Sequence, residues 1–126
     1  MSWNSGHPRA GVNVFAGNDN IRDTWSPYGN GDMLQRAMLI GYRSGSYTDA
    51  ELGIALHMAT EAGAVVLEKS NYGLNVGNEA TFIALKAPNA AAAVAGVPSD
   101  RFVVRRGELC VDASAVRAFS RRSRAI

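Results

Sequence analysis

The first apolar run of the chain is GVNVF, residues 11–15, and it is bounded by glycine on both sides. Short runs of apolar residues with high strand propensity between glycines are typical of buried strands. The sequence then turns polar in AGNDNIRDTW, residues 16–25, and glycine and proline recur until residue 31. The pattern therefore predicts a buried strand over 11–15 and a loop over 16–31.

Two segments with helical spacing of apolar residues follow this loop. Residues 32–44 have the spacing of one helix face, and so do residues 46–68. The second segment opens with Thr48, and Glu51 follows three residues later, which predicts a capping box at the helix start. Gly63 lies inside this second run, so we expect two shorter helices rather than one long helix.

The second half of the chain predicts more strands than helices. Residues 81–85 form a short apolar run that predicts a strand, and the alanine-rich residues 88–96 predict a short helix. Residues 101–113 predict a hairpin whose turn lies at Arg106 and Gly107.

The first predicted strand has no nearby partner. A strand that is apolar on both faces needs a neighbour on each side for its backbone hydrogen bonds. The remaining predicted strands lie beyond a long helical stretch. The pattern therefore indicates that the chain is one part of a larger protein fold.

Composition excludes several classes of protein. The formal net charge of +2 is too small to indicate a polyanion partner. A single cysteine, Cys110, rules out an internal disulfide, and we expect it to be a small buried residue in a strand. From the N-terminal sequence we expect no signal peptide, and no apolar run is long enough to span a membrane. We therefore expect a cytoplasmic protein with no membrane and no nucleic-acid partner.

The basic C-terminal tail keeps a second function class open. Four arginines lie within the last ten residues: Arg117, Arg121, Arg122 and Arg124. The alternative to an enzyme is a non-enzymatic interaction module whose tail contacts acidic lipid or nucleic acid. A solvated helix end accounts for the same residues, and we favour that interpretation.

The loop sequence after the first strand resembles a known motif. The stretch GVNVFAGNDNIRDTWSPYGNGDML is similar to the eighth-strand region of the cytosine-deaminase-like branch of the amidohydrolase superfamily. That motif runs Gly-x-Asp-[Asp/Asn] and continues with an Asp, an aromatic residue, a Pro and a Gly. The residues that fit it in order are Gly17, Asp19, Asn20, Asp23, Trp25, Pro27 and Gly29.

A second match lies downstream and resembles the closing pattern of the superfamily. The residues that fit it are Thr60, Ala64, Leu67, Gly73, Gly77 and Ala80. Thr81 departs from the pattern, because the superfamily usually has Asp there. The hairpin turn at Gly107 also resembles the final hairpin of the family, so the resemblance covers roughly residues 11–112.

The resemblance implies an α/β fold and a domain organisation. The family has a (β/α)8 barrel and a small composite β-sandwich, and this chain would be a C-terminal fragment of both. We expect a flexible arm over 1–10, and the last barrel strand with its following helices over 11–70. Strands of the sandwich would occupy 71–113, and a basic tail 114–126.

The resemblance also implies the chemistry. Family members hydrolyse a C–N bond of a nitrogen heterocycle with a divalent metal, usually iron or zinc, and the strand-eight Asp is both metal ligand and proton shuttle. Asp19 matches this catalytic and metal-binding position. Asn20 stands where cytosine deaminases often have a second Asp that contacts substrate, so isocytosine-like and triazine rings are as open as cytosine. Trp25 would either flank a flat substrate ring or cap the core.

The rest of the metal site is missing from the sequence. His7 and His57 are the only histidines, and neither falls on a family motif. We expect His7 in the flexible arm and His57 on a partly buried helix face. The isolated chain should therefore bind no metal and be inactive. It should self-associate or need a complementing chain, since its strand edges and apolar helix faces lack partners.

Overall fold

The computed structural model describes residues 11–112 of the 126-residue chain, with side chains up to residue 110. These residues divide into two compact units. The first unit holds the residues up to Ser70 together with Pro88–Val97, and the second holds Asn71–Ala87 and the residues from Pro98 onward.

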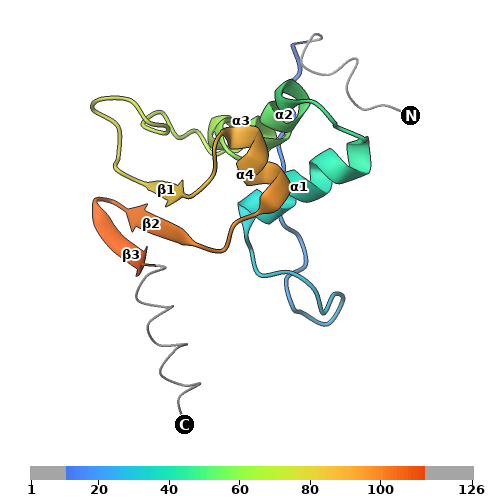
Figure 1. Cartoon of the computed structure of the whole chain (residues 1–126). Helices are drawn as coiled ribbons and strands as arrows, with labels where there is room; N and C mark the ends of the chain where they lie inside the picture. Colours follow the sequence, from blue (N-terminus) through green and yellow to red (C-terminus); the bar gives the residue numbers. More distant parts are fainter. Residues whose placement is uncertain (1–10, 113–126) are drawn as a thin grey trace. The chain divides into compact units, whose positions relative to one another are not determined.

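The first unit is helical (Figure 1). Its helices are α1 (Met33–Ser44), α2 (Asp49–Ala59), α3 (Glu61–Val66) and α4 (Ala90–Gly96). The helices predicted over 32–44, 49–68 and 88–96 are thereby confirmed. Asp32 caps α1 by accepting a hydrogen bond from the Leu34 N–H at 3.0 Å.

The predicted capping box at the start of α2 is confirmed. The Glu51 N–H donates to the Thr48 hydroxyl at 3.3 Å, and the Thr48 N–H donates to the Glu51 carboxylate at 3.0 Å. The predicted break between two shorter helices also exists, but it lies at Thr60 rather than at Gly63. The backbone leaves the helical range at Thr60, with φ −129° and ψ −96°, whereas Gly63 lies inside α3. The Thr60 hydroxyl lies 2.7 Å from the Leu56 carbonyl and 2.8 Å from the Glu61 carboxylate, and its one proton is shared between these two acceptors.

Small side chains form the core of the first unit. Helices α1, α2 and α4 contact one another pairwise. Their buried residues are Leu34, Ala37 and Gly41 on α1, Ala55 on α2, and Ala91, Ala93 and Val94 on α4. Because most of these residues are alanine or glycine, the helix backbones can approach closely.

The predicted strand over 11–15 is not a strand in the described structure. These residues have no ladder partner, and both Val12 and Phe15 are at least half exposed. Two hydrogen bonds hold the segment to the helices: the Ala16 N–H donates to the Met58 carbonyl at 2.8 Å, and the Asn13 side chain donates to the Ala62 carbonyl at 3.0 Å. The prediction is wrong here because a strand exists only with neighbours, and the described residues provide none beside it.

The second unit is a three-stranded antiparallel sheet with strand order β1-β2-β3 (Figure 1). Its strands are β1 (Phe82–Leu85), β2 (Arg101–Arg105) and β3 (Glu108–Asp112). The predicted strand over 81–85 and the predicted hairpin are confirmed. Arg106 and Gly107 both have positive φ, at 52° and 82°, which a tight two-residue hairpin turn requires.

Two features of the second unit bear on the sequence predictions. Cys110 is exposed, so the expectation of a buried cysteine is wrong. Thr81, which departs from the family pattern, accepts a hydrogen bond from the Arg106 N–H at 3.0 Å and thus joins the start of β1 to the hairpin turn. Within residues 11–112, no helix is long and apolar enough to cross a membrane.

Candidate functional site

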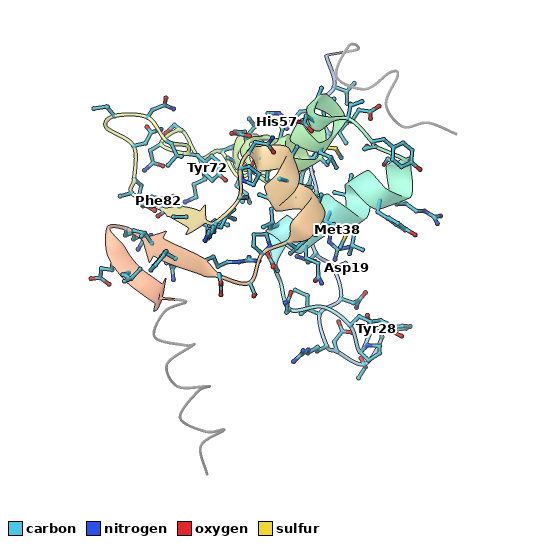
Figure 2. All side chains as sticks on the ribbon, in the orientation of Figure 1. Asp19, Tyr28, Met38, His57, Tyr72 and Phe82 are labelled. Atoms are coloured by element: carbon cyan, nitrogen blue, oxygen red, sulfur yellow. The ribbon has the colours of Figure 1, made fainter. Side chains whose placement is uncertain are left out.

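Asp19 lies at the end of the extended segment, beside the beginning of α1 (Figure 2). It lines a cavity of about 540 Å³ in the first unit. The walls come from three places along the chain: residues 17–20, the loop residues 26–30, and the first two turns of α1 with its cap. Among the described residues, no hydrogen bond reaches the Asp19 carboxylate, and the residue is exposed. The carboxylate is therefore free to meet a ligand or a further part of a protein.

The residue before Asp19 is tied to α1. The Arg36 Nε donates to the Asn18 side-chain oxygen at 3.0 Å, and the Arg36 Nη2 donates to the same oxygen. The Asn18 amide nitrogen in turn donates to the Met33 sulfur at 3.2 Å. Our sequence analysis did not identify Arg36, because nothing in the helical pattern marks it as the partner of a residue 18 positions earlier.

Asn20 lines the same cavity as Asp19, but its amide is used inside the loop. The Asn20 nitrogen donates to one Asp23 carboxylate oxygen at 2.7 Å. The other oxygen accepts the backbone N–H groups of Trp25 and Ser26 at 2.9 and 3.0 Å. The Asn20 hydrogen bond, followed by that of Trp25, lowers the pKa of Asp23, which keeps this carboxylate ionised.

Of the two aromatic residues in the loop, Tyr28 lines the cavity and Trp25 does not. The Trp25 side chain is 87 % exposed and is not part of the cavity wall. Trp25 therefore does not cap the core of the described residues, and its role toward a substrate stays a prediction. Tyr28 does line the cavity, and its position on the loop is visible in Figure 2. Tyr28 was not predicted as a site residue, although its position as an aromatic residue within a polar loop was a signal in the sequence.

His57, the histidine of the described residues, does not line the Asp19 cavity. His57 lies on α2, and its Nδ1 is 3.1 Å from the Glu61 carboxylate. Its side chain is 58 % exposed, so the expected partly buried position is wrong. His7 lies outside the described residues.

The described residues do not by themselves fit a metal ion. Within residues 11–112, no three His, Cys, Asp or Glu side chains come close enough to hold one. Asp19 offers a single carboxylate, and a catalytic metal typically needs three protein ligands. Any metal at Asp19 would need its remaining ligands from other residues.

Comparison with curated proteins identifies two relatives, although no family model matches the chain. N-isopropylammelide isopropyl amidohydrolase of Pseudomonas sp. (strain ADP) is 37 % identical over 103 residues, which is 81 % of this chain and 26 % of the relative. The uncharacterized protein YahJ of Escherichia coli (strain K12) is 32 % identical over 106 residues, or 79 % of this chain and 22 % of the relative. The chain thus spans about a quarter of the length of the curated relatives it matches.

Two solved structures of such enzymes are similar to this chain in fold as well as in sequence. The crystal structure of N-isopropylammelide isopropylaminohydrolase from Burkholderia multivorans is similar with a TM-score of 0.77 and 42 % identity, over 81 % of this chain and 26 % of that one. 5-Methylcytosine deaminase from Klebsiella pneumoniae, liganded with 5-fluorocytosine, gives a TM-score of 0.70 and 28 % identity, over 83 % and 26 %. The chain matches a C-terminal part of the cytosine-deaminase-like amidohydrolases.

Proposed function

We propose that this chain is the C-terminal part of a metal-dependent amidohydrolase that removes an amine from a nitrogen heterocycle by hydrolysis. The observation that carries the proposal is the 42 % identity, over 81 % of the chain, to a solved N-isopropylammelide isopropylaminohydrolase. The fragment contributes part of one active site, and the rest of the enzyme contributes the remainder.

The proposed architecture gives the extended segment its missing partners. Residues 11–15 would be the last strand of a (β/α)8 barrel, residues 11–70 would contain that strand with its following helices, and residues 71–113 would join a composite β-sandwich. The half-exposed Val12 and Phe15, and the lack of a ladder partner for residues 11–15 among the described residues, support this assignment, since an extended segment without a ladder can pair with strands supplied by the rest of the enzyme.

Asp19 is the proposed catalytic residue. Side chains at the carboxyl ends of barrel strands converge on one mouth, and Asp19 lies four residues after the end of the proposed strand. Its free carboxylate is suited to take a proton from the attacking water and to return it to the leaving amine. In the complete enzyme the same carboxylate would be one ligand of an iron or zinc ion, with the other ligands outside this chain.

Asn20 and Trp25 are the proposed substrate-binding residues. Asn20 lines the Asp19 cavity, and with one amide N–H bonded to Asp23 it keeps a second N–H donor and an oxygen acceptor, which can distinguish the ring edges of different heterocycles. The largely exposed Trp25 offers a flat apolar face beside which a ring can stack. The substrate class is a small nitrogen heterocycle with an exocyclic amine, such as a triazine or a pyrimidine.

A chimeric enzyme tests this function. The matching C-terminal quarter of the Burkholderia enzyme is replaced by this chain, and hydrolysis of N-isopropylammelide and 5-methylcytosine is measured. We expect turnover that falls by about 10²–10⁴-fold in Asp19→Asn, the range for losing a general acid–base group. Asp49→Asn is the matched control, because Asp49 is exposed at the start of α2 and does not line the cavity. Equal turnover by Asp19→Asn and Asp49→Asn would refute the assignment of Asp19.

A further inference from the structure

Arg36 is a half-buried cation that contacts Asn18, the residue before the proposed catalytic Asp19. It projects from the first turns of α1 and gives both its Nε and its Nη2 to the side-chain oxygen of Asn18. Two N–H groups of a planar cation on one amide oxygen form a directional, charge-assisted contact. The contact is not an exposed surface pair, because both residues are only partly accessible.

Asn18 is held from a second side by the same helix. Its amide nitrogen donates to the Met33 sulfur, so both ends of the side-chain amide contact α1. The helix is itself fixed, because Asp32 caps its N-terminus and Gly41 packs against Leu52 of α2. The Asn18 side chain is therefore anchored on a rigid element, which is what precise placement of a neighbouring group requires.

The anchor on Asn18 limits the movement of the Asp19 backbone, because Asp19 is the next residue. The extended segment is attached to the helices through the Ala16–Met58 and Asn13–Ala62 hydrogen bonds, both of which precede Asn18. The contact between Arg36 and Asn18 is the next attachment along the chain toward Asp19. Without it, only the hydrogen bond to the weakly accepting Met33 sulfur would hold Asn18, and with it the start of the Asp19 position, to α1.

We propose that Arg36 is a positioning residue that fixes the Asp19 carboxylate through Asn18. This inference rests on the proposed function, because it assigns Arg36 a role in the same reaction. Arg36 acts only through Asn18 and makes no direct contact with the Asp19 carboxylate in the described structure. A displacement of about 1 Å can cost about 10²-fold in rate, so a loose Asn18 would reduce turnover while leaving substrate binding largely intact.

Hydrogen exchange of the Ala16 amide tests the attachment without any activity. In the full chain, Arg36→Met keeps the apolar stem and removes the donors, and we expect Ala16 to exchange about tenfold faster or more, as one charge-assisted hydrogen bond is lost. Arg36→Lys should give an intermediate rate, because an ammonium keeps the charge but not the planar pair of donors. Arg43→Met, which removes the same charge from an exposed position on α1, should leave the rate unchanged. An unchanged Ala16 rate in Arg36→Met would overturn the proposal.

Kinetics of the chimeric enzyme test the consequence for catalysis. We expect Arg36→Met to lower kcat by about 10- to 100-fold with little change in KM, and Arg36→Lys to restore part of the loss. Asn18→Ala combined with Arg36→Met should be no slower than the slower single variant, since both act through one contact. An active chimera whose kcat does not respond to Arg36→Met would overturn the proposal. A chimera that turns over nothing would instead refute the proposed function, and the Ala16 exchange rate would still decide whether Arg36 holds the segment.

Discussion

Gly41 of α1 lies so close to Leu52 of α2 that a Cβ atom on Gly41 would stand 2.9 Å from the Leu52 Cδ2. Real Cβ contacts are essentially never that short, so a methyl group there must push the two helices apart or force Leu52 to move. This contact brings α2 close to α1, the helix that carries the Asn18 anchor.

In Gly41→Ala the cost of displacing the Leu52 methyl group, at most the about 1–3 kcal/mol of an overpacked contact, opposes the helix propensity that alanine gains, so this variant should have a lower free energy of unfolding than Gly53→Ala. Gly53→Ala is the control, because a Cβ atom at Gly53 of α2 would meet nothing within 4 Å. Alanine has the higher helix propensity, so Gly53→Ala should stabilise by about 0.5–1 kcal/mol. Urea unfolding followed by far-UV circular dichroism measures both; equal effects of the two variants would contradict the packing described for Gly41.

The capping box of α2 predicts a second stability effect. Thr48→Ala removes the hydroxyl that accepts the Glu51 N–H, and it should lower the free energy of unfolding by about 1 kcal/mol. Thr48→Ser keeps the hydroxyl and should lose little. The same urea titration distinguishes them, and a Thr48→Ser variant as unstable as Thr48→Ala would show that the methyl group rather than the cap is responsible.

Glu61 predicts a dependence of stability on pH. Burial raises the pKa of Glu61, but hydrogen bonding from the Thr60 hydroxyl, which the Leu56 carbonyl shares, from the backbone and from His57 outweighs it and holds the pKa below its ordinary value of 4.5. A carboxylate with a lowered pKa stabilises the fold above its unfolded-state pKa, and this stabilisation disappears as the pH falls through the folded value.

Wild type should thus lose more stability than Glu61→Gln between pH 6 and about pH 3. The effect should be small, because the Glu61 side chain is 59 % exposed and solvent screens it. Thermal melts across this range measure it, with Glu68→Gln at an exposed position as the control. A parallel decline of wild type and Glu61→Gln would contradict the prediction.

The exposed extended segment predicts association of the isolated chain. Val12 and Phe15 are 58 % and 50 % exposed, and the backbone of residues 11–15 forms no ladder, so the segment offers both apolar surface and unpaired edges. The chain at micromolar concentration should sediment as an oligomer or aggregate, and Phe15→Asp should reduce this association. A cooperatively melting monomer would show that the fold is self-contained.

Local signals explain which elements could be predicted from the sequence. The helices and the hairpin depend on caps, turn residues and spacing over a few positions, such as Thr48 with Glu51 and Arg106 with Gly107, and the structure has these elements. The helix break was displaced by three residues because the backbone leaves the helical range at Thr60, while Gly63 stays helical. Residues 11–15 were misassigned because strand pairing depends on partners far away in sequence or on another chain.

In the candidate site, too, some residues could be predicted from the sequence but their contacts could not. Asp19, Asn20 and Trp25 were identified by resemblance to a motif, not by physical pattern, and the motif does not show that Asn20 bonds to Asp23. The contact of Arg36 with Asn18 joins residues 18 positions apart, so no local pattern could reveal it. Tertiary contacts of this kind become visible only when the fold is known.

Turnover by the chimeric enzyme, compared with that of the isolated chain, tests the central claim most directly. We predict no hydrolysis of N-isopropylammelide or 5-methylcytosine by the isolated chain, because no three His, Cys, Asp or Glu side chains of the described residues lie close enough together to hold a metal ion. Fused to the remaining three quarters of the Burkholderia enzyme and loaded with metal, the same chain should support hydrolysis that depends on Asp19. Chelator-sensitive turnover by the isolated chain, or an intact and metal-loaded chimera without turnover, would contradict the claim that this chain supplies part of one amidohydrolase active site.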